Sequence, residues 1–272
     1  MFNKMHWRHW LVFGRIDGLA LLFWVAVLAL VWLSAQMQAH RPIRKIEFRI
    51  VNTTEEKMLR KSDIARYIQQ VHPRIKGIPR KGELKLAALE EALEQHPYVA
   101  NAEVYLGQND VLKVDIWQRI PQLYCKAEDG TSFYLDAEGV VMRSYGAKGF
   151  RALVASGYLP RITVEDGTKI NHPFYQKLLI LAQTIICDEV LAPLIDQIYV
   201  DSNGEVFLVP KVGANKIFFG SLTDIRSKVR KLRKFYDKGV SKMGWNRYQI
   251  IRLEYDSIII AKRAEKDEKP RG

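Results

Sequence analysis

The chain has 272 residues, a formal net charge of +12 and only two cysteines. Two cysteines exclude a disulfide framework, and the length allows one or two domains of ordinary size. The basic charge suits an anionic polymer, an anionic lipid or an acidic partner, although solubility alone would also explain it. Cys125 and Cys187 could pair in an oxidising compartment. Their places in a strand pattern and near a helix end instead favour two unrelated buried thiols.

An uncharged segment near the start predicts a membrane anchor. Residues 18–40 carry no charge, and Leu19 to Leu33 is unbroken apolar sequence. A helix of this length, rising ~1.5 Å per residue, can cross a ~30 Å hydrocarbon core. Basic residues flank both ends, so the large following region decides the orientation, with residues 1–17 in the cytoplasm. A cleaved signal peptide is the alternative, but the run stays bulky to its end and lacks a small-x-small cleavage site.

The next region, residues 42–117, has the pattern of a βααββ module. Residues 43–51 alternate as a strand, one helix begins near Ser62, and a second spans 84–93. Residues 102–106 and 111–117 then alternate around a turn, which predicts a hairpin. The order predicts a three-stranded sheet covered on one side by two helices. The expected core comprises Ile46, Phe48, Ile64, Ile68, Leu89, Leu93, Val104 and Val114.

Residues 118–262 form a second region that is rich in short strands. Strands are expected at 122–126, 132–135, 140–144, 195–200, 205–209 and 216–219, helices at 174–186 and 222–236, and two further apolar strand segments within 249–262. Strands and helices do not alternate regularly, so the fold class is α+β with a mixed, mostly antiparallel β-domain and two or three helices. The tail, residues 263–272, is polar and expected to be disordered.

No motif in the chain indicates catalysis, a cofactor or a metal. His72, His96 and His172 each precede a proline, so positions at helix termini explain them better than a shared metal site. The segment from Asp201 to Glu205 is similar to the start of a calcium loop but lacks its spacing. A hairpin turn is the simpler interpretation.

A dense basic run lies on the last predicted helix. Apolar residues interleave with it at helical spacing, so a core-packed helix with a solvated basic face is the default interpretation, and docking of an acidic partner is the alternative. The run comprises Arg226, Lys228, Arg230, Lys231, Arg233, Lys234 and Lys238.

Several motifs together resemble the FtsQ/DivIB family of bacterial division proteins. They are the N-terminal span, the βααββ module, Arg119-Ile120-Pro121, the segment from Phe133 to Val141, and Leu253-Glu254-Tyr255-Asp256-Ser257. In that family a POTRA module follows the span, and a β-domain opens with an Arg-x-Pro element. The resemblance covers nearly the whole chain.

The resemblance implies a non-enzymatic, single-pass scaffold of the inner membrane at the division septum, with its large domain in the periplasm. It implies binding of FtsB- and FtsL-like proteins and other divisome membrane proteins, with no nucleic acid and no small-molecule substrate. The alternative is a POTRA-containing factor of outer-membrane protein assembly or secretion. Such factors carry several modules or a C-terminal barrel, and this sequence shows one module and no series of ~10-residue barrel strands.

Residues 250–262 are the expected partner-binding strand. Tyr255 matches a tyrosine of the family's binding strand, and an apolar β-branched run that includes Ile258 follows it. A terminal strand with unpaired backbone groups invites a partner strand. The predicted site is Tyr255, Ser257 and Ile258, with Arg230 and Lys231 of the neighbouring helix adding charge. The alternative is an internal strand with its isoleucines in the core.

Overall fold

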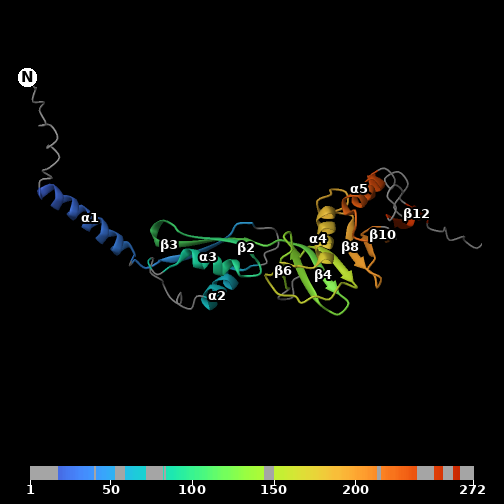
Figure 1. Cartoon of the computed structure of the whole chain (residues 1–272), viewed down its shortest axis with the longest axis horizontal. Coiled ribbons are helices and arrows are strands. Elements are labelled where there is room, and N and C mark those ends of the chain that lie inside the picture. The colour runs from blue at the N-terminus through green and yellow to red at the C-terminus, as the bar shows by residue number, and fades with distance from the viewer. Residues whose placement is uncertain are drawn as a thin grey trace, which may run out of the picture.

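The computed structural model describes residues 18–39, 41–52, 59–71, 82, 84–143, 150–212, 216–237, 248–253 and 260–263. Helix α1 (Gly18–Ala39) and two modules follow one another along the long axis of the molecule (Figure 1). Among the described residues, α1 is the one helix long and apolar enough to cross a membrane, and none of Ala20–Met37 is buried by the rest of the chain. These properties are those of a single-pass anchor.

The first module has the predicted βααββ order. Strand β3 is central in its sheet, parallel to β1 and antiparallel to β2, and a short 3-10 turn, Gln108–Asp110, joins β2 to β3. The elements are β1 (Lys45–Ile50), α2 (Lys61–Val71), α3 (Leu86–Glu94), β2 (Val99–Leu106) and β3 (Val111–Gln118). The first module is therefore α+β, as the sequence predicted.

Alternation along the strands and helical spacing in α2 and α3 direct one set of apolar side chains into a shared core. The expected residues Ile64, Ile68, Leu89, Leu93, Val104 and Val114 are buried there. Ile46 and Phe48, on β1 at the edge of the sheet, are half-buried and pack against this core. The prediction for the core is confirmed, with incomplete burial at the sheet edge.

The second module is a nine-stranded sheet with two helices. Its strand order is β12-β11-β10-β9-β8-β7-β4-β5-β6. Three neighbouring pairs, β4–β7, β7–β8 and β10–β11, are parallel and the others are antiparallel, which agrees with a mixed sheet. The elements are β4 (Pro121–Ala127), β5 (Ser132–Asp136), β6 (Val141–Met142), β7 (Leu153–Gly157), α4 (Pro173–Ile186), β8 (Ile195–Val200), β9 (Val206–Pro210), β10 (Lys216–Gly220), α5 (Ile225–Phe235), β11 (Tyr248–Arg252) and β12 (Ile260–Arg263).

Strand β7 was not predicted, although it lies inside the sheet between β4 and β8. It contains small residues and ends at Gly157, so its local pattern is weak. Gly157 has φ +100, and a Cβ atom there would lie 2.2 Å from the carbonyl oxygen of Val200. A glycine is therefore required where β7 approaches β8. With β7 in place, the units β7–α4–β8 and β10–α5–β11 are parallel crossovers within a mostly antiparallel sheet.

Helices α4 and α5 contact each other and contribute to the same core of the second module. Tyr175 and Leu178 of α4 and Leu232 of α5 are buried in this core together with strand residues such as Phe133. Cys125 is buried in β4, as expected. Cys187, the C-cap residue of α4, is exposed, so the expectation of a buried thiol was wrong there, because Cys187 lies past Ile185, the last buried residue of the helix.

Candidate partner-binding surface

Strand β12 lies at one end of the nine-stranded sheet. Its one neighbour among the described strands is β11, with which it pairs antiparallel, and Ile260 lies opposite Arg252. In a terminal strand, half of the backbone N–H and C=O groups point away from the neighbouring strand. This end of the sheet therefore has the form that strand addition requires.

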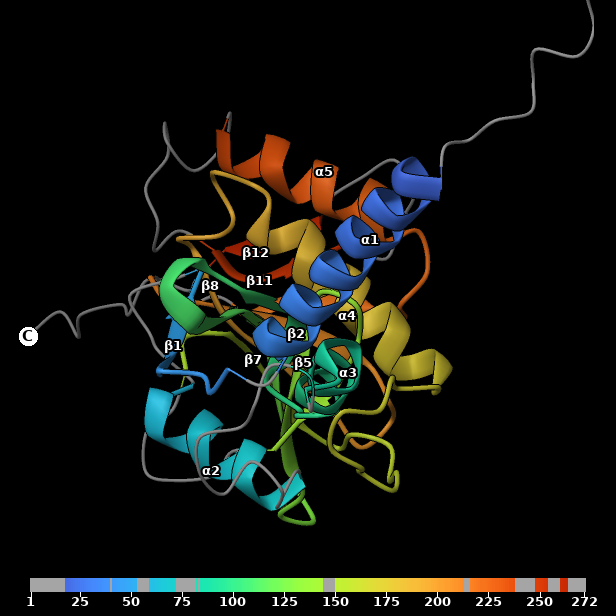
Figure 2. The same ribbon diagram turned by 90° about the vertical axis from the view of Figure 1, so that its left-hand side faces the viewer.

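Helix α5 is fixed beside this end by its apolar face. Ile225, Val229 and Leu232 are buried in the same cluster as Ile217 of β10 and Ile251 of β11. Figures 1 and 2 show α5, β11 and β12 gathered in one part of the second module, and in Figure 1 this part lies far from α1. The basic helix and the terminal strand thus belong to one region of the surface.

The basic run on α5 is not a uniform solvated face. Lys228 is buried, and its Nζ donates to the carbonyl oxygens of Phe219 at 3.1 Å and Ser221 at 2.8 Å. Arg233 forms ion pairs with Asp188 at 3.4 Å and Asp237 at 3.6 Å. These two cations hold the helix to the sheet and to the end of α4. Among the described residues of the run, Arg226, Arg230 and Lys234 are exposed, and Arg233 is exposed although it is paired.

Two of the five predicted site residues lie on α5, where Arg230 is exposed and Lys231 is half-buried. The other three, Tyr255, Ser257 and Ile258, lie outside the described residues, as does Lys238 of the basic run. The described chain on either side of these three residues ends at Leu253 and resumes at Ile260 in β12. Along the sequence, these three residues therefore come directly before the terminal strand.

The sheet face opposite the helices carries an aromatic row that the sequence reasoning missed. Tyr199, Phe207, Phe218 and Arg252 lie opposite one another on the adjacent strands β8 to β11. The ring centres of Phe207 and Phe218 are 5.0 Å apart, and the Arg252 guanidinium lies 5.0 Å from the Phe218 ring centre. Alternation within each strand could have placed these residues on one face, but their alignment depends on strand order and register.

Two of the segments that carry the family resemblance, the Arg-x-Pro element and the segment from Phe133 to Val141, are in direct contact. Arg119, of the Arg-x-Pro element, donates to Asp136 at 2.7 Å. The other carboxylate oxygen of Asp136 accepts from the backbone N–H groups of Glu138 and Val140. This arrangement fixes the turn before β6 to the start of β4, so these residues have a structural role.

The described residues contain no cluster of His, Cys, Asp or Glu side chains that could hold a metal ion. His172 caps α4, where its Nδ1 accepts from the backbone N–H of Phe174 at 3.2 Å, and His96 lies just after α3. Asp201 accepts from the N–H groups of Asn203 and Glu205 within the β8–β9 hairpin. The helix-terminus and hairpin interpretations are confirmed for these residues, and His72 lies outside the described residues.

Comparisons with known families agree with this architecture. A POTRA-like domain family matches residues 42–117, and a family described as FtsQ/DivIB, C-terminal related, matches residues 123–262. A search of curated proteins found no match. The two family matches define a class, that of POTRA-containing scaffolds of cell division. The FtsQ/DivIB-related match covers more than half of the chain, and the chain belongs to the FtsQ/DivIB family.

Proposed function

We propose that this protein is a single-pass scaffold of the bacterial divisome. Helix α1 anchors it in the cytoplasmic membrane, the N-terminal tail is cytoplasmic, and both modules lie in the periplasm at the division septum. The match of residues 123–262 to the division family favours this function over outer-membrane protein assembly. The terminal position of β12 in the nine-stranded sheet is the structural observation that carries the proposal.

The proposed partner is a segment of an FtsB- or FtsL-like protein that pairs with the sheet at this end. Main-chain hydrogen bonds to the strand would supply affinity, and alternate side chains would supply selectivity. Tyr255, Ser257 and Ile258 would contact the segment directly. Arg230, exposed on α5, and Lys231 would attract its acidic residues.

Substitution of Tyr255 tests this site. We expect Tyr255→Ala to weaken binding of the periplasmic FtsB segment to the full chain by tenfold or more, about 1.4 kcal/mol, because an aromatic anchor is lost from the interface. Isothermal titration in detergent measures the change. Tyr158→Ala is the matched control, since Tyr158 is 52% exposed and lies outside the proposed surface.

Wild-type affinity in a folded Tyr255→Ala, Ile258→Glu double variant would contradict the site. A fluorescent fusion tests the broader proposal independently. A midcell band in dividing cells is expected, and uniform labelling of the cell envelope would refute a divisome role.

A further inference from the structure

In the first module, a groove that could bind a ligand lies along the sheet edge formed by β1. Strand β1 ends the order β1-β3-β2, and its neighbour in the sheet is β3. A groove of about 800 Å³ lies between β1 and the start of α2. It runs along residues 45–50 and reaches residues 59–61, so it follows the whole length of the strand.

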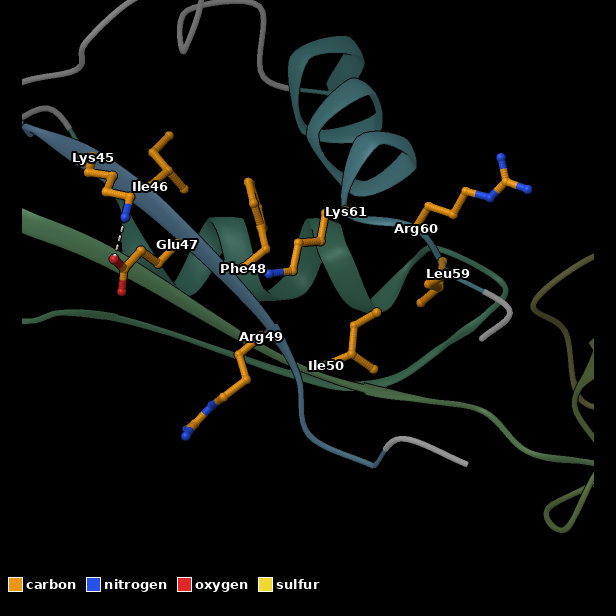
Figure 3. Close-up of a pocket in the computed structure, with 9 residues that line it drawn as sticks. All are labelled: Lys45, Ile46, Glu47, Phe48, Arg49, Ile50, Leu59, Arg60 and Lys61. Atoms are coloured by element: carbon orange, nitrogen blue, oxygen red, sulfur yellow. Dashed lines mark hydrogen bonds and ion pairs between the residues drawn. The ribbon is translucent and has the colours of Figure 1, made fainter. Parts of the chain in front are cut away.

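The floor of the groove is apolar and spaced for an extended ligand. Ile46, Phe48 and Ile50 alternate along β1, remain half-buried and pack on the module core, and Leu59 is buried beside them. Figure 3 shows Ile46 and Phe48 on the side of the strand that faces α2, and Arg49 on the opposite side. Apolar side chains at every second position of an added strand would meet this floor.

The charges around the groove are mainly positive. Lys45 pairs with Glu47 at 2.8 Å, and Arg49 pairs with Asp115 of β3. Arg60 and Lys61 are exposed at the start of α2, and Lys61 also interacts electrostatically with Glu47. Two exposed cations beside an apolar floor favour a ligand that alternates acidic and apolar residues.

The geometry points to a second binding surface, at which an extended acidic segment of a partner protein adds to β1 as a fourth strand of the POTRA-like sheet. Its apolar residues enter the groove beneath α2, and its carboxylates meet Arg60 and Lys61. This surface is distinct from the one at β12. The protein would then hold two partner segments at once, one on each module.

A defined peptide tests the groove. The probe is a fluorescein-labelled peptide of about eight residues that alternates glutamate and valine, and its binding to the full chain in phosphatidylcholine nanodiscs is followed by anisotropy. We expect saturable binding that weakens at least tenfold for a lysine–valine peptide and for a probe N-methylated at alternate backbone nitrogens. Empty nanodiscs correct for adsorption to lipid.

Variants locate the site. The Arg60→Glu, Lys61→Glu double variant should bind at least tenfold more weakly, whereas Lys85→Glu, an exposed site on the same module, should bind within twofold of wild type. Hydrogen exchange should show new protection of the amides of residues 45–50. Absence of binding, unchanged affinity in the double variant, or protection at β12 in place of β1 would overturn the proposal. The first two of these results would leave the proposed FtsB binding at β12 unaffected.

Discussion

At the residue scale, Lys228 shows how a charged side chain can be structural. The sequence pattern placed it in a basic face, yet its ammonium group is buried, donates to two carbonyl groups and lies 5.0 Å from the ring centre of Phe219. The Phe219 carbonyl lies near the end of β10, and the Ser221 carbonyl lies in the connection from β10 towards α5. Lys228 therefore ties that connection to the helix it precedes.

We expect Lys228→Met to destabilise the second module by about 1 to 3 kcal/mol, because methionine keeps the apolar stem but leaves two carbonyl groups without their donor. Lys234→Met, an exposed change on the same helix, should cost no more than about 0.5 kcal/mol. Calorimetry of the full chain in detergent would compare them, and equal midpoints for both variants would refute the role of Lys228.

His96, near the junction of the two modules, should make the stability of the protein depend on pH. Burial lowers its pKa, against the opposing effects of Asp63 and Asp166, and its Nδ1 accepts from the N–H of Tyr98 at 3.2 Å. The unfolded chain keeps a histidine pKa of about 6.5 and binds the proton more readily than the folded state. The contribution of His96 to stability is therefore complete above about pH 6.5 and declines as the pH falls from there towards the lower folded-state pKa.

Thermal unfolding between about pH 7.5 and about pH 5.5 measures this effect. The midpoint of wild-type protein should fall with pH more steeply than that of His96→Gln. The pKa of Asp115 is lowered, mainly by its hydrogen bond to Arg49. Protonation of Asp115 therefore changes the stability mainly below about pH 4, outside the pH range of this measurement. Parallel curves for the two proteins would show that His96 does not contribute.

At the scale of elements, α3 illustrates why the helical pattern was a reliable predictor. Leu89, Ala92 and Leu93 recur on one side of the helix and are buried, and Leu89 and Leu93 belong to the core of the first module. Figure 2 shows α3 nearly end-on and α2 along its length. An amphipathic helix is held mainly by packing of this face, so α3 should depend on it.

We expect Leu93→Ala to cost about 2 to 5 kcal/mol, because Leu93 is 1% exposed and its loss leaves a cavity. Leu106→Ala is the matched control, since Leu106 is 36% exposed at the end of β2 and should cost much less. The unfolding midpoint of the full chain separates the two variants. A negligible shift for Leu93→Ala would remove this residue from the core.

At the scale of the whole molecule, the two modules are joined by a shared core. Tyr134 of β5 and Met142 of β6, both in the second module, are buried in the hydrophobic cluster of the first. The Tyr98 hydroxyl donates to the carbonyl oxygen of Arg143 across this junction, and the Arg119 N–H donates to the Tyr98 carbonyl oxygen at 2.9 Å. The orientation of the modules is therefore fixed by packing as well as by the connecting chain.

The proposed topology makes a prediction at this scale. Protease added to spheroplasts should digest both modules and leave a small membrane fragment that contains α1, because a long domain after the anchor is translocated. A cytoplasmic protein serves as the control for intact membranes. Survival of the modules until lysis would reverse the orientation and refute the proposed function.

The sequence by itself determined the features that depend on local pattern. An unbroken apolar run gives α1, alternation gives most strands, and helical spacing gives α2 to α5, because each pattern reports how its own residues face water or core. Family motifs predicted the class of protein because they are also local patterns. The segments around Arg119 and Asp136, for example, are short and contiguous in the sequence.

Only the tertiary structure decided the features that depend on neighbours distant in the chain. Strand β7 lies inside the sheet because β4 and β8 flank it, and Lys228 is buried because α5 packs over β10. Cys187 is exposed because it lies past Ile185, the last buried residue of α4. The positions of β1 and β12 at sheet edges follow from strand order, which no local pattern encodes. Edge positions and burial of a charge are properties of the assembled sheet, because pairing and packing partners come from segments far apart in the sequence.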